Sequence, residues 1–173
     1  MQSCCCGTRS PVGFQRSVCI GCRNANYMLL DPCMLATAGT APVVVSLFFE
    51  RRRGARGVAS EQRILAAVLV VMPLVYVMRA LETGIQSTFW LEALGIPLFC
   101  GAALLGLLRS PWCLVVGIAS HGFAWDVWHY ARCSYVPDWY SAYCFVVDFA
   151  LAVYVASRIP TYNRFRFEQR HSR

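Results

Sequence analysis

Hydrophobic residues gather in five segments along the chain, and polar residues gather between these segments. The segments cover about residues 33–49, 64–78, 88–108, 112–130 and 139–159. A helix that crosses a bilayer needs about 20 predominantly apolar residues, with a range of about 17–25. The last three segments meet this length, the second meets it if it extends to Leu81, and the first is marginal. The pattern predicts an all-α, polytopic transmembrane helix bundle with five spans, or four if the first segment does not cross.

Arginines between the segments predict the orientation of the bundle. Five lie between the first and second segments, one lies between the third and fourth, and five lie at and after the end of the fifth. Eleven of the sixteen arginines are thus on one side. Cytoplasmic loops carry an excess of Arg and Lys. We therefore expect a multi-pass membrane protein with the N-terminus outside and the C-terminus in the cytoplasm.

The composition supports a membrane location and argues against nucleic acid as a partner. The chain is 57% hydrophobic and 14% charged, whereas soluble domains carry about 25% charged residues. Its net charge is +7, and every basic residue is Arg. These arginines lie between apolar segments, without an aromatic-interleaved basic face or a nucleic-acid motif. The expected partner is the lipid bilayer, with its anionic headgroups.

The first 27 residues differ from the rest of the chain. They hold three consecutive cysteines at 4–6 and a Cys-x-x-Cys pair at 19–22, the spacing of half a zinc site. They lack the basic and apolar regions of a signal peptide. We interpret 1–27 as a disordered tail or as upstream sequence included by a misplaced start codon. Residues 28–160 are the predicted transmembrane domain, and 161–173 are a predicted basic cytoplasmic tail.

Ionisable side chains interrupt the last three apolar segments. An acidic group at the centre of a membrane helix costs about 2.5–3.5 kcal/mol on insertion scales, and such groups usually pair, bind a ligand or move protons. At about 1.5 Å per residue, two layers are expected, one in the outer third of the membrane and one near its middle. The outer layer holds Glu92, Asp126 and His129, and the middle layer holds His121 and Asp148.

A helical wheel refines this prediction. In a regular α-helix, at about 100° per residue, Asp126 and His129 lie about 60° apart, and His121 and Asp126 about 140° apart. Both histidines can then face one cavity, with Trp125 as a wall, but the three polar residues cannot share a narrow stripe. We expect a polar pocket that opens toward the outer side of the membrane.

Several functions fit such a pocket. In the first, a divalent transition metal binds to His121, Asp126 and His129, because imidazole and carboxylate are common ligands of Zn, Fe or Mn. In the second, His129 and Asp126 act as a catalytic acid–base pair, and the binding pocket is formed by Glu92, His121, Trp125 and Asp148. A proton or ion relay, or a small transporter, is the third. A structural or accessory role without catalysis is the fourth, so whether the protein is an enzyme stays open.

The same residues carry a resemblance. The chain resembles, over about residues 88–155, a group of small bacterial integral-membrane proteins without an assigned activity. Their pattern is Trp-Glu, then His-x-x-Trp-Asp-x-x-His-His, then a Cys-Asp pair. The counterparts in this chain are Trp90-Leu91-Glu92, His121 with Trp125-Asp126-Val127-Trp128-His129-Tyr130, and Cys144 with Asp148. His121 lies one residue further from Trp125 than in the pattern, Tyr130 replaces the second His, and Cys144 and Asp148 are separated. The resemblance implies a location in a bacterial inner membrane and the position of the site, and no chemistry.

Overall fold

The computed structural model describes residues 32–83, 86–132 and 135–172, and all of its regular elements there are helical. Residues 1–27, predicted to be a tail, lie outside the described residues. The elements are α1 (Pro32–Arg52), η2 (Gly54–Arg56), α2 (Val58–Thr83), α3 (Gln86–Leu108), α4 (Trp112–Ser120), η3 (His121–Asp126), α5 (Val127–Arg132) and α6 (Asp138–His171). The all-α prediction is therefore confirmed for the described residues.

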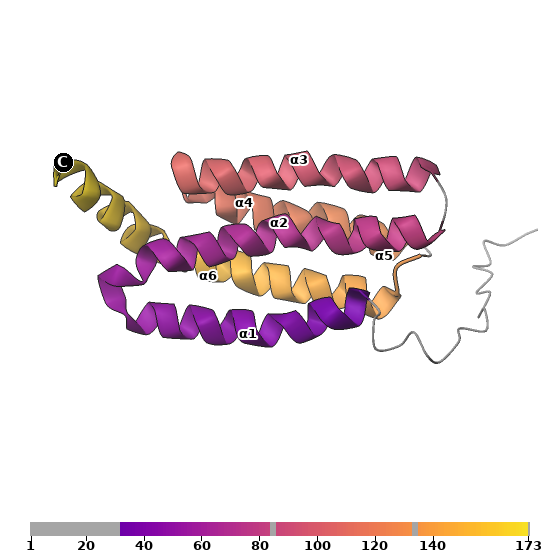
Figure 1. Cartoon of the computed structure of the whole chain (residues 1–173), viewed down its shortest axis with the longest axis horizontal. Helices are drawn as coiled ribbons and strands as arrows, with labels where there is room; N and C mark the ends of the chain where they lie inside the picture. Colours follow the sequence, from indigo (N-terminus) through magenta and orange to yellow (C-terminus); the bar gives the residue numbers. More distant parts are fainter. Residues whose placement is uncertain (1–31, 84–85, 133–134, 173) are drawn as a thin grey trace, which may run out of the picture.

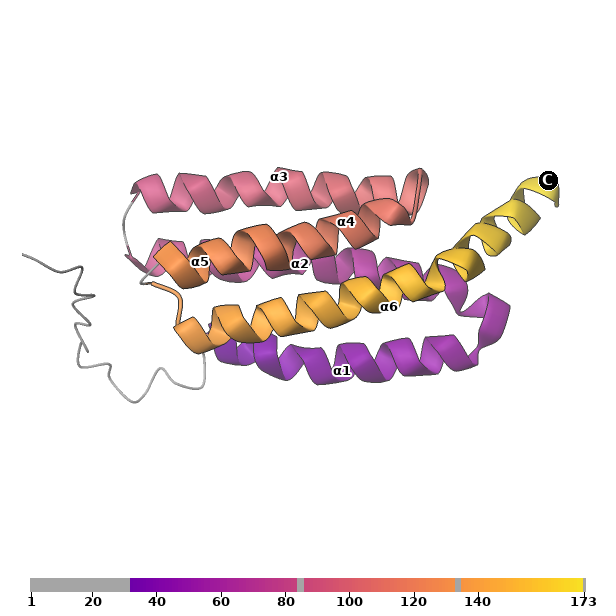
Figure 2. The same ribbon diagram turned by 180° about the vertical axis from the view of Figure 1, so that it is seen from behind.

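The helices run along one long axis as a bundle (Figure 1). Helix α2 packs against α3 and α1, and α4 packs against both α3 and α6. Seen from behind, α4 and α5 follow one another in a single rod beside α6 (Figure 2). The C-terminal part of α6 projects beyond the other helices (Figure 1).

Glycines shape the turn between α1 and α2. Gly54 has a φ of +60°, a left-handed conformation that costs glycine little, and it ends the helical path of α1. A Cβ on Gly57 would lie 1.9 Å from the backbone oxygen of Glu50. Only glycine permits this close approach of the start of α2 to the end of α1.

Four helices, namely α1, α2, α3 and α6, are long and apolar enough to cross a membrane. The predicted first segment, marginal by length, is part of the 21-residue helix α1. The predicted fourth segment instead forms three consecutive helical pieces, because a π-helical turn, η3, separates α4 from α5. The described helices thus support a membrane protein with four apolar helices of spanning length.

The core of the bundle is formed by aliphatic and aromatic side chains, and small residues allow the helices to approach one another. Leu65, Leu69, Leu114 and Val155 are fully buried there. A Cβ on Gly117 of α4 would lie 2.7 Å from Leu69 Cδ2 and 2.9 Å from the Ala102 Cβ. Small residues at such contacts are typical of membrane helix packing, which relies on close van der Waals contact.

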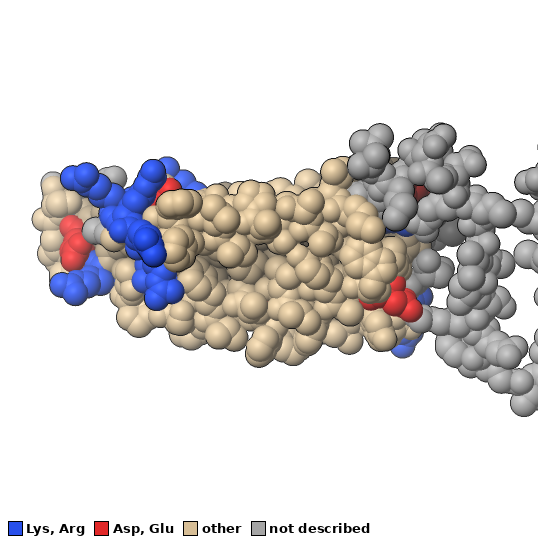
Figure 3. Space-filling view, turned by 90° about the horizontal axis from the view of Figure 1, so that it is seen from below, with Lys and Arg blue, Asp and Glu red and all other residues tan. Residues whose placement is uncertain are grey.

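The surface of the bundle separates charged ends from an uncharged middle. In Figure 3, basic side chains gather at the end that holds the C-terminus, and a broad uncharged belt lies between this end and the other. Apolar side chains such as Leu94, Leu98, Val116 and Val146 are exposed on the outside of the helices. A belt of this kind matches the hydrocarbon region of a bilayer.

Candidate functional site

A π-helical turn brings His121 and Asp126 together. In the structure, His121 Nδ1 lies 3.6 Å from Asp126 Oδ1, although the two residues are five apart in the sequence. A regular α-helix would place them about 140° apart, as the helical wheel assumed. The i→i+5 bonding of a π-helix instead brings residues five apart onto one face, and such turns often occur at functional sites.

Asp148 of α6 completes this group. Its Oδ2 lies 2.7 Å from His121 Nδ1, so this ring nitrogen faces the carboxylates of both Asp126 and Asp148. Gly122 makes the approach of α6 to η3 possible, because a Cβ there would lie 3.0 Å from the Asp148 Cβ. The three side chains are buried inside the bundle.

The three residues form a compact set of potential metal ligands, which we call the triad (His121, Asp126 and Asp148). One ligand atom from each lies within 4.8 Å of the others. Two buried polar atoms of the triad, His121 Nε2 and Asp126 Oδ2, have no hydrogen-bond partner among the described residues. One imidazole supplies at most one positive charge against two carboxylates. A bound divalent cation would balance this charge and use the free carboxylate oxygen.

His129 belongs to a separate group with Glu92. Its Nδ1 lies 2.7 Å from the backbone oxygen of Trp125, and because a carbonyl oxygen only accepts, Nδ1 must carry a proton and donate. Its Nε2 lies 2.8 Å from Glu92 Oε1. Tyr135 also donates its hydroxyl proton to Glu92 Oε1. Both nitrogens of His129 are therefore engaged, and this ring is not free to bind a metal without losing a bond.

Tyr76 of α2 connects the two groups. Its hydroxyl donates to Asp126 Oδ1 over 2.6 Å, and its ring centroid lies 4.1 Å from that of His129. Tyr76 was not among the site residues predicted from the sequence. A tyrosine in the middle of an apolar helix is a signal of its own, since a buried phenol needs a hydrogen-bond partner.

The structure places the predicted site residues in two groups. His121 lies with Asp148 and Asp126, and Glu92 lies with His129. Trp125, predicted as a cavity wall, packs its ring 5.7 Å from that of His129 and 5.7 Å from that of Phe99. Its indole nitrogen is buried and has no partner among the described residues.

A second buried acidic site, centred on Glu61, was not predicted from the sequence. Glu61 of α2 is fully buried and accepts hydrogen bonds from Tyr154 (2.8 Å) and Tyr162 (2.6 Å). Arg158 binds both of its oxygens, each over 3.0 Å, in a bidentate pair. The partners lie more than 90 residues away on α6, so no local pattern in the sequence shows them. Both carboxylate oxygens of Glu61 accept hydrogen bonds from side chains of α6, which indicates that Glu61 holds α2 to α6.

Comparisons with family models, with curated proteins and with solved structures find no match to this chain. Functional inference therefore rests on the geometry of the two groups.

Proposed function

We propose that this chain is an integral membrane protein whose triad binds one divalent transition metal ion. The observation that carries the proposal is the convergence of His121, Asp126 and Asp148, from two helices, on a single buried point. A mixed imidazole and carboxylate set suits Zn, Fe or Mn. Three protein ligands leave a further coordination position, as in catalytic zinc sites.

The metal would be supported by Tyr76 and accompanied by the Glu92–His129 pair. The Tyr76 hydroxyl would orient the Asp126 carboxylate, as hydrogen-bonded neighbours of metal ligands commonly do. Glu92 Oε1 and His129 Nε2 lie 2.8 Å apart, and this hydrogen-bonded pair would hold or release a proton near the metal. In the catalytic version of the proposal, the Glu92–His129 pair would act as the acid–base partner for chemistry that the metal supplies.

Metal content tests the proposal directly. Full-length protein is purified in detergent after growth with Zn, Fe and Mn, and elemental analysis is expected to give about one divalent ion per chain. Asp148→Asn and His121→Gln should both lose it. Glu61→Gln is the matched control, because it changes a buried carboxylate of another site and should keep the metal.

Three results would contradict the metal proposal. One is a wild-type protein without stoichiometric metal after supplementation with all three ions. Another is equal loss of metal in the Glu61→Gln control, which would indicate a general effect of misfolding. The third is a full metal content in both triad variants, as a purely structural role of the triad requires.

Proton relay is the second candidate function. It is favoured by the position of Tyr76 between the triad and the Glu92–His129 pair. Hydrogen bonds join Asp148 to His121, Asp126 to Tyr76, and His129 to Glu92, with the Tyr76 ring lying against His129. Chains of buried carboxylates and histidines suit proton movement in membranes. Proton flux into vesicles that contain the protein should fall in Asp148→Asn. An unchanged flux, or a wild type without flux, removes this candidate.

For the membrane arrangement we propose five spans, with the N-terminus outside and the C-terminus in the cytoplasm of a bacterial cell. The span added to α1, α2, α3 and α6 would be the continuous helical run α4–η3–α5, residues 112–132, which is about 30 Å long at 1.5 Å per residue. The clustering of arginines at the C-terminal end supports the orientation (Figure 3).

A fluorescent protein fused to the C-terminus should fluoresce, and an N-terminal tag should be accessible outside intact spheroplasts. An inaccessible N-terminal tag would favour four spans.

A further inference from the structure

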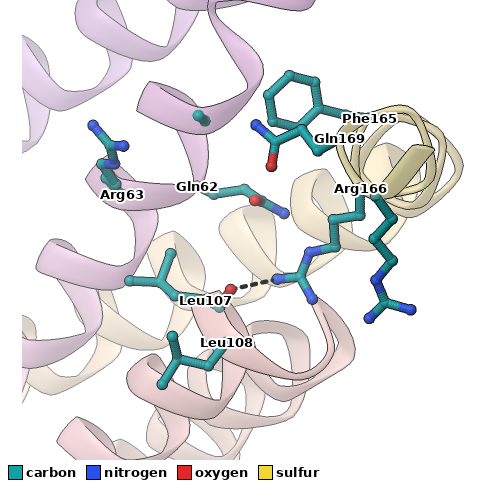
Figure 4. A pocket seen from close by; sticks show the side chains of 9 residues that line it. Gln62, Arg63, Leu107, Leu108, Phe165, Arg166 and Gln169 are labelled. Carbon is teal, nitrogen blue, oxygen red and sulfur yellow. Dashed lines mark hydrogen bonds between the residues drawn. The ribbon is translucent and has the colours of Figure 1, made fainter. Parts of the chain in front are cut away.

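A cavity that shares no residue with the triad lies between the first turns of α2, the last turn of α3 and the C-terminal part of α6 (Figure 4). Its volume is about 390 Å³, within the range of small-molecule sites, about 300–1,000 Å³. Neither the proposed metal site nor the Glu92–His129 pair contributes to it. The residues that line it combine positive charge, amide groups and apolar surface.

Three arginines give the cavity its charge. Arg63, Arg166 and Arg170 line it, and no acidic residue does. The side chains of Arg63 and Arg170 are exposed, and neither makes a hydrogen bond or an ion pair with any part of the chain that the structure describes. Unpaired guanidinium groups around a concave surface attract anions, and their planar donors match phosphate and carboxylate oxygens.

Arg166 lines the cavity, and hydrogen bonds hold it in a fixed position. Its guanidinium donates to the backbone oxygens of Gly106 (2.7 Å), Leu107 (2.8 Å) and Arg109 (2.8 Å) at the end of α3. These bonds satisfy carbonyl groups that a helix end leaves without partners. Figure 4 shows the bond to Leu107, with Gln62 nearby. Because three carbonyls orient the group, its remaining donors are pre-organised for a ligand.

Gln62 supplies an independent indication of a ligand. This side chain is only 6% exposed and lines the cavity. Its amide nitrogen is buried and has no hydrogen-bond partner among the described residues. An unsatisfied buried donor costs about 1–3 kcal/mol, and an acceptor oxygen bound in the cavity would remove this cost.

Apolar residues form the rest of the lining. Leu107 and Leu108 end α3, and Phe165 lies on the same part of α6 as Arg166. Positive and amide groups next to apolar side chains, at the arginine-rich end of a membrane bundle, match the boundary between lipid headgroups and acyl chains. We propose that this cavity binds a phosphate-bearing anion, such as the headgroup of an anionic phospholipid.

Native mass spectrometry of the full-length protein tests the proposal. Phosphatidylglycerol, phosphatidylcholine or inorganic phosphate is added as the probe. The test variant is Arg63→Gln with Arg170→Gln, and the control is Arg56→Gln with Arg164→Gln, which removes the same charge outside the cavity. One molecule of phosphatidylglycerol should bind per chain with high affinity. This affinity should fall about ten-fold or more in the test variant and stay unchanged in the control variant. Gln62→Leu, which leaves the net charge unchanged, should also weaken binding.

The two sources of phosphate are separated by competition. Displacement of the lipid by millimolar inorganic phosphate supports a site for the phosphate group alone, and lack of displacement supports a site for the headgroup together with its acyl chains. Equal weakening in the two double variants would overturn the proposal, because it would show a diffuse charge effect. Equal binding of phosphatidylcholine, or full binding in Gln62→Leu, would overturn it as well.

Discussion

His121 Nδ1 lies 2.7 Å from Asp148 Oδ2, which joins the π-helical turn η3 to the middle of α6. This contact depends on two features of the backbone. The π-helical turn rotates His121 and Asp126 toward one face, and Gly122 leaves room for Asp148. Because Asp126 also points at His121 Nδ1, the contact defines the centre of the proposed metal site.

Gly122→Ala should damage the site through sterics. The new Cβ would lie 3.0 Å from the Asp148 Cβ, so α6 or Asp148 must move. Overpacking of this kind costs about 1–3 kcal/mol, and we expect a lower apparent Tm and reduced metal content. Gly101→Ala is the control, because its Cβ meets nothing within 4 Å and alanine favours helix by about 1 kcal/mol. Equal behaviour of the two variants would contradict the proposed role of Gly122.

His129→Gln should keep the metal, whereas His121→Gln should lose it. His129 is outside the triad, and its Nδ1 is engaged with the Trp125 carbonyl. A glutamine amide can still contact Glu92. The measurement is metal stoichiometry of both purified variants. Loss of the metal in both variants would favour the ligand set expected from the sequence, with His129 in place of Asp148.

Tyr76→Phe should weaken metal binding without removing it. The substitution deletes the 2.6 Å hydrogen bond to Asp126 Oδ1 and keeps the ring beside His129. Loss of a residue that orients a metal ligand typically costs about 10–100-fold in affinity. Chelator competition measures this change. Tyr143→Phe, which removes a 2.7 Å bond to Thr40 elsewhere in the bundle, should leave affinity unchanged, and an equal loss in both would argue against the role of Tyr76.

Glu61→Gln should lower stability and leave the metal in place. Arg158 would lose its bidentate carboxylate, and hydrogen bonds to charged groups contribute about 1.5–3 kcal/mol. At this chain length, 1 kcal/mol shifts Tm by about 2–4 °C, so thermal unfolding should show a drop of several degrees. Glu168→Gln removes only an exposed pair with Arg164, worth about 0–1 kcal/mol. Similar Tm values for both variants would show that the contacts of Glu61 with α6 do not stabilise the fold.

Much of the membrane character was predictable from the chain because hydrophobicity acts locally. The length of each apolar run limits the helix that it can form, and the predicted segments 88–108 and 139–159 correspond to α3 and α6. The ionisable residues of the last three segments stood out for the same reason, since a charge in an apolar run is visible without any partner.

The grouping of those residues was decided by tertiary structure. A periodicity of 3.6 cannot show a π-helical turn, so the helical wheel separated His121 from Asp126, which lie 3.6 Å apart. The partners of Tyr76 and Glu61 could not be found from the sequence, because they lie 50 or more residues away. The sequence by itself determined which residues are costly to bury, since that cost belongs to each side chain. Only the packed helices decided which of them meet, because contacts between helices depend on backbone geometry that no single segment encodes.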